Sequence, residues 1–166
     1  MNSDPFTTLG VDRRFDLDTE DLRRRFIAAS SEVHPDRFTD PIEQADAVEK
    51  MSRVTDAFRV LSDPELRARA LLRLSGLEAE GDKDKLPPDL LMQVMEVREE
   101  MEAAIEASNR PEMDRLRGWA ESQRQQYLDQ LKALFENELD AKSAAKARLE
   151  LNALRYMQRM LEQLPD

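Results

Sequence analysis

Residues 22–61 read LRRRFIAASSEVHPDRFTDPIEQADAVEKMSRVTDAFRVL, and this stretch decides the fold. Apolar side chains recur at helical spacing on each side of a polar centre, which predicts two amphipathic helices. Pro35 disfavours helical geometry in the preceding residue, so the first helix is predicted to end near Val33 and residues 37–43 to form a loop. The predicted buried stripes are Leu22, Phe26, Ala29 and Val33 in one helix, and Val48, Met51, Val54, Thr55, Phe58 and Leu61 in the other.

Two shorter helices are predicted to flank this antiparallel pair. Segment 4–10 begins with an Asp-Pro pair and stops at a glycine, which is the pattern of one short helix. Asp63-Pro64 starts another helix by the same rule, and the apolar run behind it stops at Gly76. The amino-terminal part of the chain is therefore predicted to be a small four-helix domain.

The rest of the chain is predicted to form a second helical domain. Residues 77–88 contain alternating charges, one glycine and two prolines without any periodicity, so they are predicted to be a linker. The domains are then residues 1–76 and 89–166. Helices are expected at about 89–107, 111–136 and 140–164, which predicts a three-helix bundle and an all-α fold.

Composition agrees with packed helices and excludes several functions. The chain has 166 residues, of which 40% are apolar and 36% charged, and it contains only 4 glycines. A net charge of -10 argues against nucleic-acid binding, because contact with phosphates needs a surplus of Lys and Arg. The beginning of the chain has no signal-peptide pattern and no long apolar run follows, so a soluble cytoplasmic protein without membrane contact is expected.

The side chains that hold metals and cofactors are scarce. No Cys is present, which removes disulfides, thiolate nucleophiles and any iron–sulfur cluster held through protein sulfur. A zinc site would have only one His to draw on and would need carboxylates for its other ligands. No metal and no cofactor are therefore expected.

The tripeptide His34-Pro35-Asp36 lies in the loop between the two central helices. It presents an imidazole, a rigid turn and a carboxylate to solvent, which suits contact with another protein. Taken alone, it could equally be a simple helix terminator. A third interpretation, an enzyme with His34 as general base, lacks a second catalytic group, so no enzymatic activity is expected.

The surrounding sequence resembles the J-domain. The resemblance runs from Phe6 to Leu74 and rests on Leu9-Gly10-Val11, an arginine-rich second helix, His34-Pro35-Asp36-Arg37, and residues 57–64, which read AFRVLSDP. It implies docking on a seventy-kilodalton heat-shock-type chaperone, of the HscA or DnaK type, and stimulation of its ATPase. The chaperone-binding residues that it implies are His34, Pro35, Asp36, Arg37, Arg24 and Arg25.

The chain also resembles the HscB family of iron–sulfur assembly co-chaperones. Residues 14–18, 67–76, 90–101 and 154–157 carry this resemblance, and no Gly/Phe-rich or Cys-rich region follows the J-domain. It implies an L-shaped arrangement of the two domains and binding of an iron–sulfur cluster scaffold protein of the IscU type. A different client, or self-association through the bundle, is the alternative.

Surplus apolar residues in the second domain indicate a binding surface. The stripe Leu90, Val94, Val97, Met101 and Ile105 is predicted to face the core, as are Leu151, Leu154, Leu161 and Leu164 of the last helix. Tyr156 and Met160 are left on another flank of that helix. Exposed apolar patches often bind proteins, and Met adapts well to a partner. The scaffold-binding residues implied by the resemblance are Leu91, Met92, Met95 and Tyr156, flanked by Glu96 and Glu99.

Overall fold

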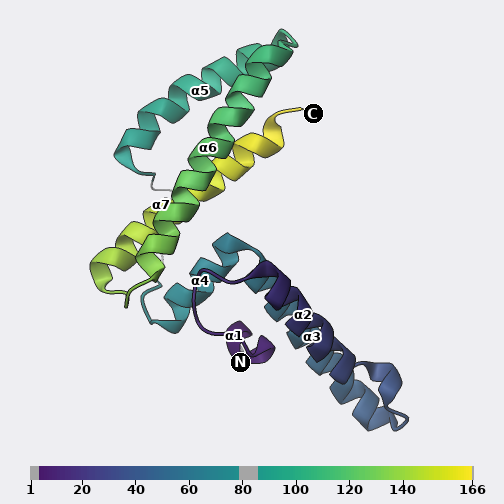
Figure 1. Ribbon diagram of the computed structural model, residues 1–166. Coiled ribbons are helices and arrows are strands. Elements are labelled where there is room, and N and C mark those ends of the chain that lie inside the picture. Colours follow the sequence, from purple (N-terminus) through teal and green to yellow (C-terminus); the bar gives the residue numbers. More distant parts are fainter. Residues whose placement is uncertain (1–3, 79–85, 166) are drawn as a thin grey trace. The chain divides into compact units, whose positions relative to one another are not determined.

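A computed structural model describes residues 4–78 and 86–165, and every regular element within them is helical (Figure 1). The all-α fold predicted from the sequence is thus confirmed. The elements are α1 (Pro5–Leu9), α2 (Thr19–Glu32), the short 3-10 helix η1 (Pro35–Arg37), α3 (Pro41–Ser62), α4 (Pro64–Leu74), α5 (Pro88–Glu106), α6 (Arg110–Phe135) and α7 (Ala141–Gln163).

The chain divides into two compact units, Met1–Gly76 and Leu77–Asp166. Residues 79–85 of the predicted linker lie outside the described residues. The last residue of that predicted linker, Pro88, already belongs to α5. Leu77 belongs to the second unit, where its carbonyl accepts a hydrogen bond of 2.8 Å from Arg148 of α7.

Short polar side chains start most of these helices. Each of the caps Asp18, Asp40 and Asp63 accepts a hydrogen bond from a backbone amide of the first turn, which satisfies a donor that the helix cannot pair. The Asp40 cap is followed by Pro41, so α3 begins there and the loop predicted over residues 37–43 is too long. The same Asp-Pro rule that located α4 also marks the start of α3.

The first unit is organised by the antiparallel pair of α2 and α3, with α1 and α4 packed on α3 (Figure 1). Phe6 and Leu61 are fully buried, and the rings of Phe26 and Phe58 stack with their centroids 4.3 Å apart. Val48, predicted to be buried, is instead 57% exposed, and its neighbour Ala47 faces the core.

A buried arginine fastens α4 to the loop before α2. Arg67 donates to the carbonyl oxygens of Leu61 at 2.7 Å and Phe15 at 2.6 Å, and its guanidinium lies 5.6 Å from the centre of the Phe15 ring. Burial lowers the pKa of Arg67, and the charges of Asp63 and Asp16 oppose this. Because it satisfies two carbonyls and stacks on an aromatic ring, Arg67 here has a structural role.

In the second unit α6 and α7 form a long antiparallel hairpin, and α5 packs mainly on α6. Leu116 and Leu131 of α6 and Leu151 of α7 are fully buried between them. Two burial predictions are wrong in this unit. Ile105 is 37% exposed while Ala104 is buried, and Met160 is buried at 3% exposure. Periodicity around one helix does not tell how closely the neighbouring helices pack against it, and this packing decides the burial of such side chains.

The hairpin also buries a carboxyl group. Glu150 of α7 is 6% exposed, and burial raises its pKa, against the opposing charge of Lys146. When the side-chain amide of Gln130 is oriented to donate, its nitrogen lies 2.8 and 3.0 Å from the two carboxylate oxygens. At neutral pH this charge is removed from water at a cost in stability.

Replacing Glu150 with glutamine is expected to stabilise the second unit at pH 7 by about 1 kcal/mol. The pKa of Glu150 is higher in the folded chain than its ordinary value of 4.5. The wild-type chain therefore loses this penalty as the pH falls through the raised pKa, and the advantage of the variant should shrink toward pH 4.5 and disappear below it. Trp119, the single tryptophan, lies in α6 and reports urea unfolding of this unit. An equal gain at both pH values, or the same gain in the exposed control Glu138→Gln, would contradict the prediction.

Candidate functional site

The loop with His34-Pro35-Asp36 follows α2 and forms the single turn of η1. His34 is the cap of that turn, and its Nδ1 accepts from the amide of Asp36 at 3.3 Å. The side chains of His34 and Asp36 are 49% and 89% exposed. Arg37 donates back to the carbonyl of Ser31 in α2 at 3.1 Å. The loop is therefore an ordered, exposed turn whose imidazole and carboxylate are accessible to a partner.

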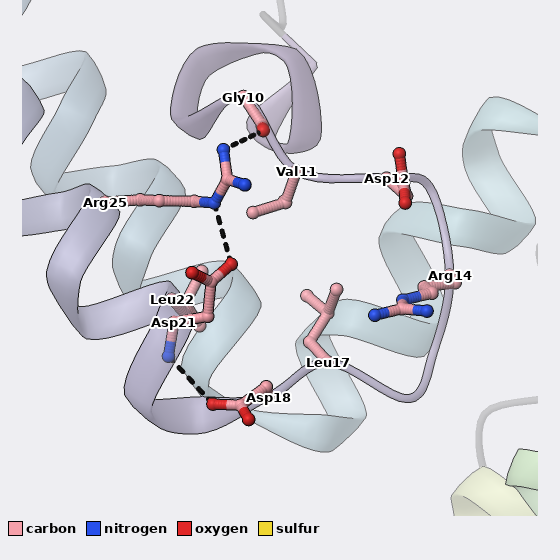
Figure 2. A pocket seen from close by; sticks show the side chains of 9 residues that line it. All are labelled: Gly10, Val11, Asp12, Arg14, Leu17, Asp18, Asp21, Leu22 and Arg25. Atoms are coloured by element: carbon pink, nitrogen blue, oxygen red, sulfur yellow. Dashed lines mark hydrogen bonds and ion pairs between the residues drawn. The ribbon is translucent and has the colours of Figure 1, made fainter.

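The predicted arginines of α2 are partly engaged within the chain. Arg24 and Arg25 both pair with Asp21 at 2.8 Å, and hydrogen bonds from Arg25 and Arg24 lower the pKa of that carboxyl. Arg25 also donates to the carbonyl oxygen of Gly10, across a hollow of about 120 Å³ (Figure 2). Gly10 has a φ of 63°, a left-handed conformation that favours glycine. Arg25 thus holds the end of α1 to α2, while Arg24 is 74% exposed.

The structure adds a residue that the sequence analysis missed. Ile27 is 57% exposed on α2, and it lines a shallow surface hollow together with Arg23 and Arg24. Its position just off the buried stripe of α2 was the available signal. The basic face of α2 therefore has an apolar member.

The second candidate surface lies on α5. Leu91, Met92 and Met95 are 53%, 73% and 64% exposed, and Glu96 and Glu99 beside them are also exposed. Three large apolar side chains this open to solvent on adjacent turns form a patch of the kind that binds proteins. We call these five residues the α5 patch.

Tyr156, the remaining predicted scaffold-binding residue, lies on α7. It is partly buried and lines a hollow with Arg98 and Ile105 of α5, so it borders the later turns of α5. Met160, predicted to accompany it on the exposed flank, forms part of the buried floor of that hollow.

The described residues offer neither a metal site nor a membrane-spanning helix. Within residues 4–78 and 86–165 no three acidic or histidine side chains are grouped so that they could hold a metal ion. Over the same ranges, none of the helices combines the length and apolar character needed to span a bilayer.

Comparison with protein-family models gives two matches. Residues 4–69 match the DnaJ domain, and residues 86–165 match the HSCB C-terminal oligomerisation domain. Together these matches cover most of the chain.

Relatives found by sequence similarity are named co-chaperone proteins. The chain is 36% identical over 119 residues to a co-chaperone protein HscB homolog of Azoarcus sp. (strain BH72), covering 70% of this chain and 67% of the relative. It is 37% identical over 107 residues to a co-chaperone protein HscB homolog of Neisseria gonorrhoeae, covering 63% of this chain and 64% of that one. The chain thus spans about two thirds of the length of these relatives.

Solved structures extend the similarity along the whole chain. Human co-chaperone protein HscB aligns with a TM-score of 0.84 and 25% identity, over 98% of this chain and 80% of the human one. Chaperone HscB from Vibrio cholerae aligns with a TM-score of 0.81 and 26% identity, over 98% and 95% of the two chains. With an exposed His-Pro-Asp turn in a DnaJ domain followed by the matching carboxy-terminal domain, the chain belongs to the HscB family of J-domain co-chaperones.

Proposed function

We propose that this chain is an adaptor that binds an iron–sulfur cluster scaffold protein of the IscU type and delivers it to a seventy-kilodalton heat-shock-type chaperone. The observation that carries the proposal is the presence of two exposed surfaces on separate compact units. One is the His-Pro-Asp turn of the first unit, and the other is the α5 patch of the second. A protein with two such surfaces can hold two partners at once.

At the chaperone end, His34, Pro35 and Asp36 are proposed to make the central contact. Two features support this role: the side chains of His34 and Asp36 are exposed, and hydrogen bonds to the backbone hold the turn. A turn that is already held in place has little conformational entropy left to lose on binding. Arg24 and Arg37 are proposed as electrostatic contacts. Arg25 is proposed to contribute mainly by holding Asp21 and Gly10 in place, although its side chain is still 45% exposed.

At the scaffold end, Leu91, Met92 and Met95 of α5 are proposed as the apolar anchors. Tyr156 of α7 is proposed as a further contact. Methionine side chains are flexible and polarisable, so they adapt to the surface of a partner. Glu96 and Glu99 are proposed to select a partner with basic residues at matching positions, since charged rims contribute more to specificity than to affinity.

The proposed contribution of the chain is tethering rather than catalysis. Binding both partners raises the effective concentration of scaffold at the chaperone. Preferential binding to one state of the chaperone shifts its conformational equilibrium and so its rate of ATP hydrolysis. The proposed location is the cytoplasm, a compartment that supplies the ATP which the chaperone hydrolyses.

Steady-state ATP hydrolysis by the chaperone tests this proposal. The chain and the scaffold protein are added separately and together, and stimulation by both together should exceed the sum of the separate effects. If the chain alone stimulates the ATPase and the scaffold adds nothing, the chaperone remains the proposed partner, but the proposed binding of the scaffold is wrong. In that case a different client, or self-association through the second unit, would be the better assignment.

A further inference from the structure

A hollow of about 450 Å³ lies between α5 and α7 in the second unit. It exists because α5 packs mainly on α6, which leaves the later turns of α5 and α7 separated at the surface. The hollow, called here the α5–α7 groove, is lined chiefly by Met101, Ile105, Tyr156 and Met160, with Arg98 and Arg159 at its rim. The hollow is half open to solvent, so it would enclose only part of an inserted side chain.

The groove continues the α5 patch along one edge of the helix. Leu91 and Met95 are followed by Arg98, Glu102 and Ile105, at alternating steps of four and three residues. This spacing places all five on one side of an α-helix. A partner that covers Leu91 and Met95 and continues along α5 therefore reaches the groove.

The floor of the groove is apolar. Met101 and Met160 are almost fully buried beneath it, and Ile105 remains 37% exposed at its edge. An inserted apolar side chain would remove this remaining surface from water. Pockets of this kind receive the anchor residues that supply most of the binding energy of a protein interface.

The rim of the groove is positively charged although the chain has a net charge of -10. Glu102 offsets Arg98, because its Oε1 lies 3.1 Å from the Arg98 Nε. Arg159 is exposed and makes no ion pair with another side chain in the described parts of the protein. Glu96 and Glu99 of the α5 patch lie on the same helix as Arg98, with Glu99 directly after Arg98 in the sequence. At the groove itself, Arg159 therefore provides a positive charge that no ion pair of the described residues offsets.

We propose that the α5–α7 groove receives an apolar side chain of the scaffold protein that lies next to a carboxylate, and that Arg159 pairs with that carboxylate. This inference rests on the proposed function, since it extends the binding surface for the same partner. Arginine suits this role because its planar guanidinium can hold a carboxylate through two hydrogen bonds.

Continuity with the α5 patch favours the scaffold over a second copy of this chain as occupant. Two copies would also bring together surfaces with the same large negative net charge, which opposes association. Self-association is nevertheless a measurable outcome, and sedimentation velocity distinguishes it from scaffold binding.

The test is calorimetric titration of the full chain with a purified IscU-type scaffold protein. Arg159→Glu should weaken binding by roughly tenfold, whereas Arg159→Lys should weaken it less, because lysine keeps the charge but loses the two-bond geometry of the guanidinium. Ile105→Asp, at the groove edge, should also weaken binding. The matched control is Lys142→Glu, an exposed charge reversal in the first turn of the same helix. Helix content and Trp119 fluorescence confirm that each variant is folded.

The charge itself is tested by salt and by rescue. Added salt should weaken binding of the wild type, because it screens the ion pair, but should strengthen binding of Arg159→Glu, because it screens the repulsion between two carboxylates. Replacing single acidic residues of the scaffold with lysine should identify one position that restores binding to Arg159→Glu. This rescue would name the carboxylate that the groove recognises.

The outcomes separate the two proposals. If the wild type does not bind the scaffold, both fail. If the wild type binds, and Leu91→Ala/Met92→Ala weakens binding while Arg159→Glu and Ile105→Asp do not, the groove proposal fails and the proposed function stands. A change in self-association with unaltered scaffold affinity would assign the groove to a second copy and overturn the inference.

Discussion

Replacing His34 with glutamine is expected to reduce stimulation of the chaperone ATPase by at least about tenfold, which corresponds to the loss of about 1.4 kcal/mol from the activating interaction. The imidazole is half exposed, and its Nδ1 accepts a hydrogen bond from the Asp36 amide. The ring therefore holds the turn and is also accessible to a partner. Glutamine is polar but lacks the rigid ring. Steady-state ATP hydrolysis at saturating chain concentration measures the effect.

The His34→Gln change should leave the rest of the protein intact. Its side chain lies on the surface of the first unit, and scaffold affinity belongs to the second unit under the proposed function. Asp12→Asn is a suitable control, since Asp12 is exposed in the loop that precedes α2, whereas His34 follows that helix. Full stimulation by His34→Gln would reject the proposed role of the turn, and equal loss in the control would point to a general defect.

The double substitution Leu91→Ala/Met92→Ala is expected to weaken scaffold binding by about 100-fold, or roughly 3 kcal/mol, because central apolar anchors each contribute on the order of 1 to 2 kcal/mol. Both side chains are more than half exposed in the free chain. Their truncation therefore leaves no cavity in the core, and stability should change little. Isothermal titration of the folded variant with the scaffold protein gives the affinity.

A truncation of similar chemistry in the first unit controls for this experiment. Ile42 is 75% exposed on α3, so Ile42→Ala removes a comparable apolar surface without touching the second unit. It should leave scaffold affinity unchanged. Binding by Leu91→Ala/Met92→Ala within about threefold of the wild type, less than 1 kcal/mol, would show that the α5 patch is not the anchor.

Local rules explain why the helices could be predicted closely from the sequence. An Asp or Asn that caps an amide, a proline in the first turn and a glycine at the end act within a few residues, so they are visible in the chain. Asp63-Pro64 located α4 in this way. For α3, the polar composition of residues 37–43 predicted too late a start, whereas Asp40-Pro41 marks the correct one.

The exposed surfaces were only partly predictable. Leu91, Met92 and Met95 departed from the core stripe of α5, and the structure does leave them open to solvent. The same reasoning was wrong for Met160, which is buried, and for Ile105, which is exposed. Periodicity gives the direction of a side chain around its own helix, but it does not tell which neighbouring helix lies there or how far away it is.

By itself, the sequence determined the all-α fold, the family resemblance and the candidate turn at His34-Pro35-Asp36, because caps, periodicity and motifs are properties of neighbouring residues. Only the tertiary structure decided that Arg25 is tied to Gly10, that Arg67 joins α4 to Phe15, and that Arg159 stands at the rim of a groove with an apolar floor. Each of these depends on residues far apart in the chain, and their meeting is set by how whole helices pack.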